Sequence, residues 1–294
     1  MLNFRLVEKE DIKILREFYD HTESIGMECN PLNAYLWREK FNIYITVKNG
    51  TLFKAYLTDD GKIWGYSMPV GGDLRMAVEE IFADAKERKS TPTIALLTKA
   101  ERATLETLYP SKFVYTRSPE NQDYIYLSED LINLSGKKFH AKRNHISRFF
   151  KTYDNVRFAL IDKSNKVDAY NVAVDWCKEN NVDFENYYEM DIIRDALENM
   201  EEYRMRGAVL YVDEKPVAMT MGSEISKIAF DVNFEKALRS YDGVYAVINN
   251  EFAKTLSAYK YINREEDMGI EGLKKAKLSY NPIIILDRYN AQPK

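Results

Sequence analysis

Residues 131–153 read LINLSGKKFHAKRNHISRFFKTY and separate two parts of the chain that are similar in length. This basic stretch holds six lysines and arginines and no acidic residue, although the whole chain has a formal net charge of −4. At helical spacing its aromatic and aliphatic side chains fall on one side and its basic side chains on the other. We expect a helix beginning at Ser135 that packs through one face and offers positive charge to an anionic ligand. A solvated helical face is the alternative.

The composition indicates a globular protein with no membrane-spanning segment. Hydrophobic residues make up 45% and charged residues 30% of the 294 residues, enough for a large core and for two domains. The acidic balance argues against a general duplex DNA-binding protein but leaves a local basic groove open. Cys29 and Cys177 form no disulfide or metal-binding pattern, and His140 and His145 do not share a helical face, so no metal site is expected. Without a signal peptide, the protein is predicted to be cytoplasmic.

The same order of elements is predicted on both sides of the basic stretch. Before it, periodicity and turn residues predict two helices, three strands, a helix, a strand, a helix and two strands, at residues 8–20, 31–36, 43–47, 51–57, 62–70, 74–85, 93–97, 100–108 and around 113 and 124. After it they predict two helices, three strands, a helix, a strand, a helix and a strand, at residues 167–179, 186–203, 207–212, 217–221, 227–233, 244–256, 261–263, 271–278 and 282–288. We therefore predict two domains of one fold, 1–130 and 155–294, joined by a basic linking helix at 131–154.

This order of elements resembles the GNAT acyltransferase fold, here occurring twice. Three stretches, DLINLSGKKFHAKRNHISRF, RSYDGVYAVINNEFA and INREEDMGIEGLKKAKLSYNP, resemble a bacterial family of uncharacterised proteins related to the catalytic C-terminal domain of phosphatidylglycerol lysyltransferases. The resemblance covers nearly the full length and implies an α+β fold of two tandem GNAT-like domains. The better-known relatives move an aminoacyl group from charged tRNA to a lipid or peptide amine or hydroxyl.

The GNAT resemblance also implies a place for an acyl donor, at the N-terminus of the helix after the fourth strand, where free N–H groups favour anions. In the second half this place falls on Arg239, Tyr241 and Gly243. The loop departs from the usual Gln/Arg-x-x-Gly-x-Gly/Ala pattern by one extra residue, and Asp242 at its turn would repel a pyrophosphate. Acyl-coenzyme A is therefore a disfavoured donor and no cofactor is expected. Residues 71–73 of the first half match less well, and capped strand-to-helix turns are the alternative in both halves.

An aminoacyl-tRNA donor would need cations for the phosphates of its acceptor end. We predict that the donor is bound by cationic and polar side chains of the basic stretch, together with Arg264 further along the chain. The predicted members of the basic stretch are Lys138, Lys142, Arg143, His145 and Arg148.

Acyl transfer needs a group that takes a proton and donors for the developing oxyanion. The candidates are Asp231 on a predicted strand, Glu266 and Asp267 in the charged loop after residue 263, and Tyr280 as an acid for the leaving group. This loop combines Arg264 with several acids and is followed by glycines that let a ligand approach the backbone. A polar loop closed by a salt bridge from Arg264 is the alternative.

The leading hypothesis from the sequence is a transferase that moves an acyl group, an aminoacyl group from tRNA above all, to an amine or hydroxyl. The acceptor would be a small molecule, a peptide or a lipid headgroup, and the site would lie between the second sheet and the basic helix. Two alternatives are kept: a non-catalytic protein that binds an anionic ligand or RNA, and an acyl-coenzyme A-dependent N-acyltransferase.

Overall fold

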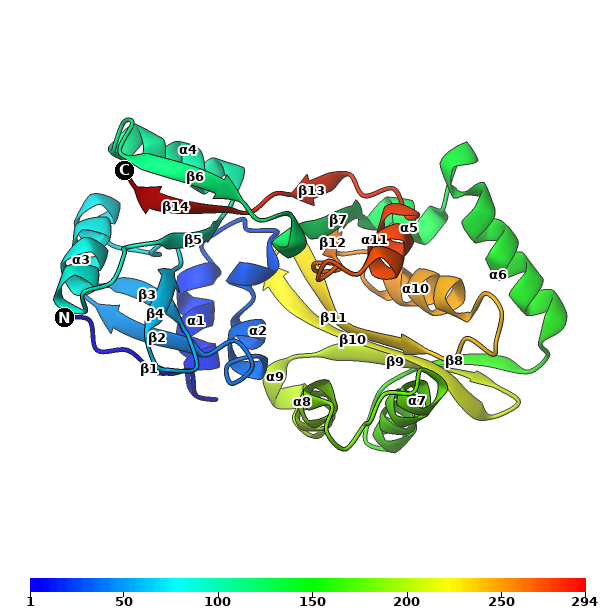
Figure 1. Ribbon diagram of the computed structural model, residues 1–294. Helices are drawn as coiled ribbons and strands as arrows, with labels where there is room; N and C mark the ends of the chain where they lie inside the picture. Colours follow the sequence, from blue (N-terminus) through cyan, green and yellow to red (C-terminus); the bar gives the residue numbers. More distant parts are fainter. The chain divides into compact units, whose positions relative to one another are not determined.

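The computed structural model describes residues 1–294 and divides into two compact units. The first unit comprises Met1–Asp123, Glu266–Glu271 and Ile285–Lys294, and the second comprises Tyr124–Glu265 and Gly272–Ile284. Each unit is built on one seven-stranded mixed sheet (Figure 1).

The first unit has a sheet in which only β4 and β5 run parallel. Across the sheet the strands are β1 (Arg5–Leu6), β2 (Ile43–Lys48), β3 (Thr51–Leu57), β4 (Ile63–Tyr66), β5 (Ile94–Leu97), β14 (Tyr289–Pro293) and β6 (Phe113–Arg117). Its helices are α1 (Asp11–Tyr19), α2 (Pro31–Leu36), α3 (Leu74–Glu87) and α4 (Lys99–Leu108), with short 3-10 turns at Met27–Cys29 and Pro119–Asn121. Asn49 and Gly50 both have positive φ, which a tight turn between antiparallel strands requires, and Asp73 caps α3 as expected.

The second unit repeats this plan. Across its sheet the strands are β13 (Ile284–Leu286), β7 (Asp123–Leu127), β12 (Tyr261–Asn263), β11 (Ala229–Ala237), β10 (Lys215–Ser226), β9 (Arg206–Val212) and β8 (Val156–Leu160). Its helices are α5 (Ser128–Asn133), α6 (His140–Thr152), α7 (Lys166–Glu179), α8 (Tyr188–Glu198), α9 (Met200–Tyr203), α10 (Val244–Thr255) and α11 (Glu271–Leu278), with a 3-10 turn at Lys137–Phe139. The parallel pair is β11 and β12, with α10 between them in the chain.

Both units therefore place helices between two antiparallel neighbouring strands, α1 and α2 between β1 and β2, and α7, α8 and α9 between β8 and β9. Both also place a long helix between two strands that run parallel, α3 between β4 and β5, and α10 between β11 and β12. This arrangement confirms the predicted fold class, α+β with two GNAT-like domains in tandem. None of the helices α1 to α11 has the length and apolarity needed to cross a bilayer.

The two units exchange strands. In the first sheet the place between β5 and β6 is filled by β14, which comes from the end of the sequence. In the second sheet the place beside β12 is filled by β7, which precedes the basic stretch. The observed units therefore interleave along the chain, whereas the sequence predicted contiguous domains with boundaries at residues 130 and 155. The basic helix α6 is also part of the second unit rather than a separate linker.

Three local expectations differ from the structure. The basic helix begins at His140 after a 3-10 turn, not at Ser135, because Leu134 and Gly136 both adopt positive φ and interrupt the helix. The helix expected over residues 186–203 is split into α8 and α9, which meet at Asn199. Strands β8 and β14 were not expected.

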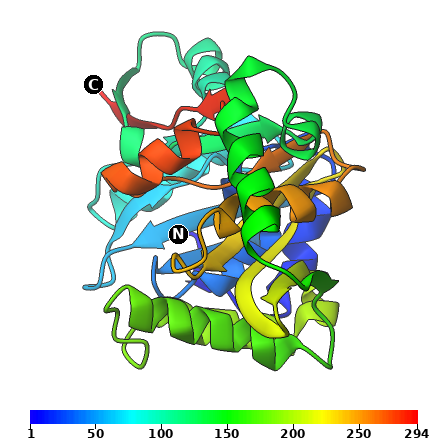
Figure 2. The same cartoon turned by 90° about the vertical axis from the view of Figure 1, so that its right-hand side faces the viewer.

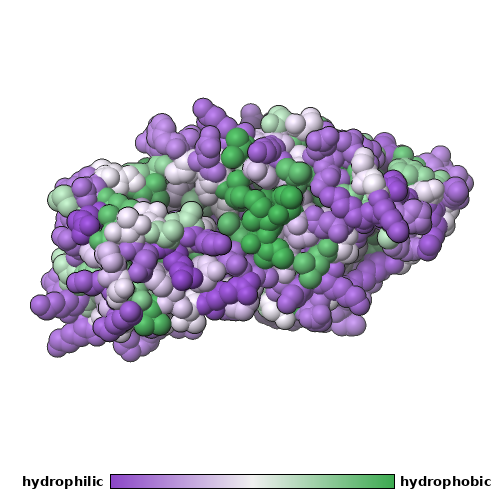
Figure 3. All heavy atoms as spheres, turned by 90° about the horizontal axis from the view of Figure 1, so that it is seen from above, coloured by the Kyte–Doolittle hydropathy of each residue, from purple (hydrophilic) through white to green (hydrophobic).

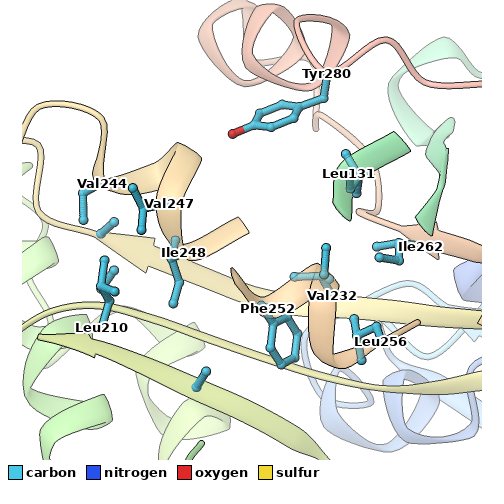
Figure 4. Packing of buried hydrophobic residues seen from close by; sticks show 14 of the residues in the cluster. Leu131, Leu210, Val232, Val244, Val247, Ile248, Phe252, Leu256, Ile262 and Tyr280 are labelled. Atoms are coloured by element: carbon cyan, nitrogen blue, oxygen red, sulfur yellow. The ribbon is translucent and has the colours of Figure 1, made fainter. Parts of the chain in front are cut away.

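The core of the second unit lies between α10 and its sheet. Figure 4 shows Leu210, Val232, Val247, Ile248 and Phe252 grouped between the helix and the strands, and all five are buried. Helix α10 also contacts α6, which Figure 2 shows crossing it. The apolar face of α10 therefore fixes the place of the helix next to both the sheet and the basic helix.

Strand β11 contains an irregularity that turns its side chains. Met221 of β10 pairs with Phe234, but Ser223 pairs with Asp231, so β11 has one extra residue between these two pairs. In a regular strand, side chains three apart point to opposite faces. Here Val232 packs in the core beside α10, and Glu235 also reaches a side chain of α10. The bulge thus brings a carboxylate to the helix-covered face of the sheet.

Candidate functional site

A partly buried ion pair lies where β11 and the end of β12 meet α10. Glu235 Oε1 accepts a hydrogen bond from Arg264 Nη2 at 2.7 Å, and the two side chains are 11% and 12% exposed. Burial by itself disfavours the charged guanidinium, but the carboxylate of Glu235 outweighs this effect and raises the pKa of Arg264 above its usual range. The guanidinium of Arg264 is therefore charged at neutral pH.

The pair is incompletely satisfied. Asn249 of α10 donates its Nδ2 to Glu235 Oε2 at 3.3 Å, but its Oδ1 is buried and accepts no hydrogen bond. Arg264 Nη1 is likewise buried without a hydrogen-bond acceptor. Such groups each cost about 1–3 kcal/mol, and native proteins contain few of them. One donor and one acceptor thus remain available beside a carboxylate.

Aromatic rings complete the surroundings of Arg264. Its guanidinium carbon lies 4.8 Å from the centre of the Tyr280 ring and 5.8 Å from that of Tyr126. The same Tyr280 ring is approached at 3.6 Å by the ammonium of Lys142, from the basic helix. Figure 4 shows Tyr280 reaching from the segment after α11 toward α10. Two cations therefore share one aromatic ring.

The backbone that carries Arg264 is held in place by its neighbours. The N–H of Arg264 donates to the carbonyl of Tyr124, and the carbonyl of Arg264 accepts a hydrogen bond from the buried ammonium of Lys277. The hydroxyl of Tyr126 in turn donates to the carbonyl of Lys277 at 2.8 Å. These bonds fix the guanidinium in advance of any ligand, which is the condition for electrostatic stabilisation of a reacting group.

Most basic side chains of the 131–153 stretch have partners within the protein. Lys138 pairs with Asp130 at 2.8 Å and Arg148 pairs with Asp242 at 3.0 Å, while Arg143 donates to the carbonyls of residues 134 and 136. Exposed pairs of this kind contribute about 0–1 kcal/mol, so phosphates could replace them. The stretch is therefore less positive than its own sequence indicates, because acids from outside it lie alongside.

Side chains from α7 and from the end of α6 bind the backbone N–H groups of the loop before α10. The N–H groups of Arg239 and Ser240 donate to the carboxylate of Glu179, at 2.6 and 3.0 Å, and that of Asp242 donates to Tyr153. Burial opposes the charge of Glu179, but these backbone N–H groups outweigh it and lower its pKa. A protein carboxylate thus occupies the place at which the sequence predicted a phosphate.

The remaining residues of this predicted phosphate site pack against neighbouring side chains or α6. Tyr241 contacts Tyr153, with 5.3 Å between ring centres. Gly243 has φ +87°, and a Cβ there would lie 2.7 Å from the backbone carbonyl oxygen of His145 on α6. The glycine therefore allows the close contact between α10 and α6, and His145 contributes its backbone to that contact.

The ion pair is formed by Glu235 and not by one of the predicted acids. Asp231 is completely buried on β11 and accepts a hydrogen bond from Asn233 at 3.3 Å. Glu266 and Asp267 belong to the first unit, where Asp267 is buried and accepts the N–H of Gly269 in a turn. The ring of the predicted catalytic residue Tyr280 lies beside Arg264 of the ion pair and beside Lys142, both of them predicted binding residues.

Sequence reasoning missed Glu235 and Asn249. Asn249 stands with Asn250 directly after the apolar run VYAVI, and two amides in a helix that is expected to be buried could have been recognised as candidates for a site. Glu235 lies in a strand whose alternation breaks at the bulge, so its direction could not be predicted from period two. Residues 1–294 contain no group of three His, Cys, Asp or Glu side chains placed to hold a metal ion.

Comparisons with known proteins establish the family. The model described as phosphatidylglycerol lysyltransferase, C-terminal, matches residues 24–292. A conserved protein of unknown function from Bacteroides thetaiotaomicron is 36% identical in sequence, and its crystal structure covers 100% of both chains with a TM-score of 0.90. L-PGS from Bacillus licheniformis is 12% identical and has the same fold, with a TM-score of 0.68 over 98% of this chain and 92% of that one.

An uncharacterized protein of Mycoplasmoides gallisepticum is 22% identical over 197 residues, which cover 66% of this chain. The match spans 62% of that relative, less than two thirds of its length. The family match over residues 24–292 agrees with the resemblance carried by the three sequence stretches. The chain belongs to the family of phosphatidylglycerol lysyltransferase C-terminal domains.

Proposed function

We propose that the second unit transfers an aminoacyl group from aminoacyl-tRNA to an amine or hydroxyl acceptor, with the reacting ester bound at Glu235, Asn249 and Arg264. Membership of the lysyltransferase family supports this class of reaction. The observation that carries the assignment to these residues is the unfilled pair of hydrogen-bonding groups, Arg264 Nη1 and Asn249 Oδ1, on either side of the Glu235 carboxylate.

An α-aminoacyl ester has the complementary groups. Its ammonium can donate to Asn249 Oδ1 and is attracted by Glu235, while its carbonyl oxygen can accept from Arg264 Nη1. When an acceptor attacks the ester carbon, negative charge develops on that carbonyl oxygen, where a fixed guanidinium stabilises it. A simple acetyl group offers no ammonium for Asn249. The donor set therefore favours an aminoacyl donor over acetyl-coenzyme A.

The surroundings of the site agree with this choice of donor. The loop before α10 already binds the carboxylate of Glu179, so its N–H groups are engaged. The tRNA phosphates would instead meet the exposed cations of α6, of which Arg143 and Arg148 carry weak surface contacts.

The acceptor is left as an amine or hydroxyl of a small molecule, a peptide or a lipid headgroup. Figure 3 shows a group of hydrophobic residues exposed on one face of the molecule. Ile283 and Ile285, before and in β13, are 54% and 40% exposed. Exposed apolar groups of this kind are common at lipid- and partner-binding surfaces. Vesicles containing phosphatidylglycerol are therefore included among the acceptors to be tested.

The test offers the purified protein two donors, tRNA charged with radiolabelled amino acids and labelled acetyl-coenzyme A, with and without acceptors. We expect release or transfer of label from aminoacyl-tRNA alone. Transfer from acetyl-coenzyme A alone would contradict the proposal. Binding of aminoacyl-tRNA without release of label would support the non-catalytic alternative.

A matched pair of variants then locates the site. Glu235→Gln alters the proposed site, whereas Glu189→Gln alters a second partly buried ion pair, formed with Lys236 at 2.6 Å. Glu189 lies on α8, but its partner Lys236 is the neighbour of Glu235 on β11, so each substitution removes a charge paired with or placed on that strand. We expect loss of transfer in Glu235→Gln and retention in Glu189→Gln. Equal loss in both would indicate a general effect on folding.

A further inference from the structure

Lys142 differs from the other basic side chains of α6. Lys138 and Arg148 each pair with a carboxylate, and Arg143 is held by two carbonyls. Lys142 has no carboxylate within 4 Å; its ammonium donates to Ser279 Oγ at 2.7 Å and lies 3.6 Å from the centre of the Tyr280 ring. It is therefore the lysine of this helix directed to the same aromatic ring as Arg264.

The charged and titratable groups around this ammonium are few. From the chain after β12 comes the positive charge of Arg264, from β11 the carboxylate of Glu235, and from the segment after α11 the ring of Tyr280. Burial and the charge of Arg264 lower the pKa of Lys142 to about 8, against the weaker opposing effect of Glu235. At pH 7, Lys142 is then neutral in about one tenth of the protein molecules.

We propose that Lys142 is the general base of the transfer reaction, taking the proton of the acceptor's hydroxyl or amine as that group attacks the aminoacyl ester held at Arg264. This inference rests on the proposed function. A bond forms between the acceptor's oxygen or nitrogen and the ester carbon, and the bond from that carbon to the ribose oxygen of tRNA breaks. The proton taken by Lys142 passes to the leaving ribose oxygen, so Lys142 returns to its neutral form.

The neighbouring groups are less suited to this step. Arg264 remains protonated, and both carboxyl oxygens of Glu235 already accept hydrogen bonds, from Arg264 and Asn249. Burial, against the opposing charge of Arg264, raises the pKa of Tyr280 above its usual range, so its hydroxyl stays protonated. Lys142 is the group in this cluster that can both accept and release a proton near pH 8.

A labelling experiment tests the titration of Lys142 without any substrate. The folded protein is treated briefly with an amine-reactive probe over a series of pH values, and modification of Lys142 is followed by mass spectrometry. We expect a midpoint near pH 8, and a higher midpoint in Arg264→Gln, because a neighbouring positive charge has been removed. A midpoint above pH 10, unchanged in Arg264→Gln, would overturn the inference.

Kinetics of the variants test the role in transfer. Lys142→Arg retains a positive charge but cannot give up its proton near neutral pH. We expect its transfer rate to fall by about 10²–10⁴-fold, with aminoacyl-tRNA still bound, and the rise of the wild-type rate toward a plateau above pH 8 to disappear. Lys178→Arg, an exposed position on α7, serves as the matched control and should retain the wild-type rate and pH profile.

The outcomes separate this inference from the proposed function. Transfer by the wild-type protein together with an unchanged pH profile in Lys142→Arg would overturn the role of Lys142 and leave the proposed function standing. Absence of transfer from aminoacyl-tRNA by the folded wild-type protein would overturn both. Circular dichroism of each variant shows whether a lost rate reflects lost folding.

Discussion

Two arginines with little solvent exposure, one in each unit, are bound in different ways. Arg288 is 2% exposed; its Nε and Nη2 donate to the carboxylate of Asp123, and its Nη1 donates to the carbonyl of Leu96. Arg264 has one carboxylate contact through Nη2 and leaves Nη1 unfilled. Low exposure of an ion pair is thus a poor guide to function, because the side chains of both pairs are at most 12% exposed. Unfilled hydrogen-bonding capacity distinguishes the candidate site from the structural pair.

The largest expected effect is on the stability of the first unit. Arg288→Met leaves the buried carboxylate of Asp123 without its partner, and we expect a loss of about 3–5 kcal/mol in the free energy of unfolding. Urea denaturation followed by circular dichroism measures this loss. The double variant Arg288→Met with Asp123→Asn should recover part of it. A loss below 1 kcal/mol in the single variant would contradict the structural role of Arg288.

Arg264→Gln should lower the transfer rate strongly and the stability of the fold only a little. We expect the transfer rate to fall by about 10²–10³-fold, equivalent to about 2.7–4 kcal/mol, because the carbonyl oxygen loses its fixed donor. Stability should fall less than in Arg288→Met, since Arg264 leaves part of its hydrogen-bonding capacity unused in the folded protein. Single-turnover transfer and urea denaturation of the same preparations measure both. If the loss in the free energy of unfolding exceeds the loss in transition-state stabilisation, Arg264 has a structural role, as Arg288 does.

Acid should lower the stability of the first unit by protonating Glu28, whose carboxylate interacts with Arg288 and Lys54. Burial alone would raise the pKa of Glu28, but the charges of Lys54 and Arg288 and hydrogen bonds from Lys54 and Tyr56 lower it to about 2. Because the folded pKa lies below the ordinary value of 4.5, the stabilisation is full above that value and is lost as pH falls from about 4.5 to 2.

This acid-sensitive part amounts to about 3 kcal/mol by linkage. Unfolding measured between pH 6 and pH 2 should show it in the wild-type protein. In Glu28→Gln the pH dependence over this range should be smaller. Identical slopes for the two proteins would show that Glu28 is not the responsible group.

The smallest expected effect comes from two neighbouring asparagines of α10. Asn250 donates to the carbonyls of Leu131 and Ile132 at 2.7 and 2.8 Å, whereas Asn249 leaves Oδ1 unfilled. Asn250→Leu should cost about 2 kcal/mol of stability, and Asn249→Leu about 1 kcal/mol or less. Transfer should fall in Asn249→Leu. Thermal unfolding and the transfer assay measure the two effects, and the reverse order of stabilities would argue against an open site at Asn249.

Much of the fold could be predicted because its signals are local. Tight turns such as Asn49-Gly50, a capping aspartate at residue 73 and helical periodicity in α10 determine elements over a few residues. The exchange of β7 and β14 could not be predicted in this way. Strand partners far apart in the sequence are selected by the packing of whole sheets, and periodicity does not record which sheet a strand joins.

The candidate site was predicted in part for the same reason. Lys142 was predicted as part of the basic stretch, Arg264 as part of the charged loop, and Tyr280 as an acid for the leaving group. The direction of the Glu235 side chain is set by the bulge in β11 and could not be predicted. Lys138 and Arg148 pair with acids that lie outside the basic stretch, Asp130 and Asp242. A charge run read in isolation overstates the positive potential of a surface, because the fold decides which acids lie beside it.

The position of β14 has a consequence for how the protein is made. Asn290, in that strand, accepts the N–H of Leu96 across 194 residues of sequence. On a ribosome, the segment that fills the gap between β5 and β6 emerges only after all the strands of the second sheet have been synthesised. The sheet that starts first is therefore completed last, and until then its two unpaired strand edges need protection from other nascent chains.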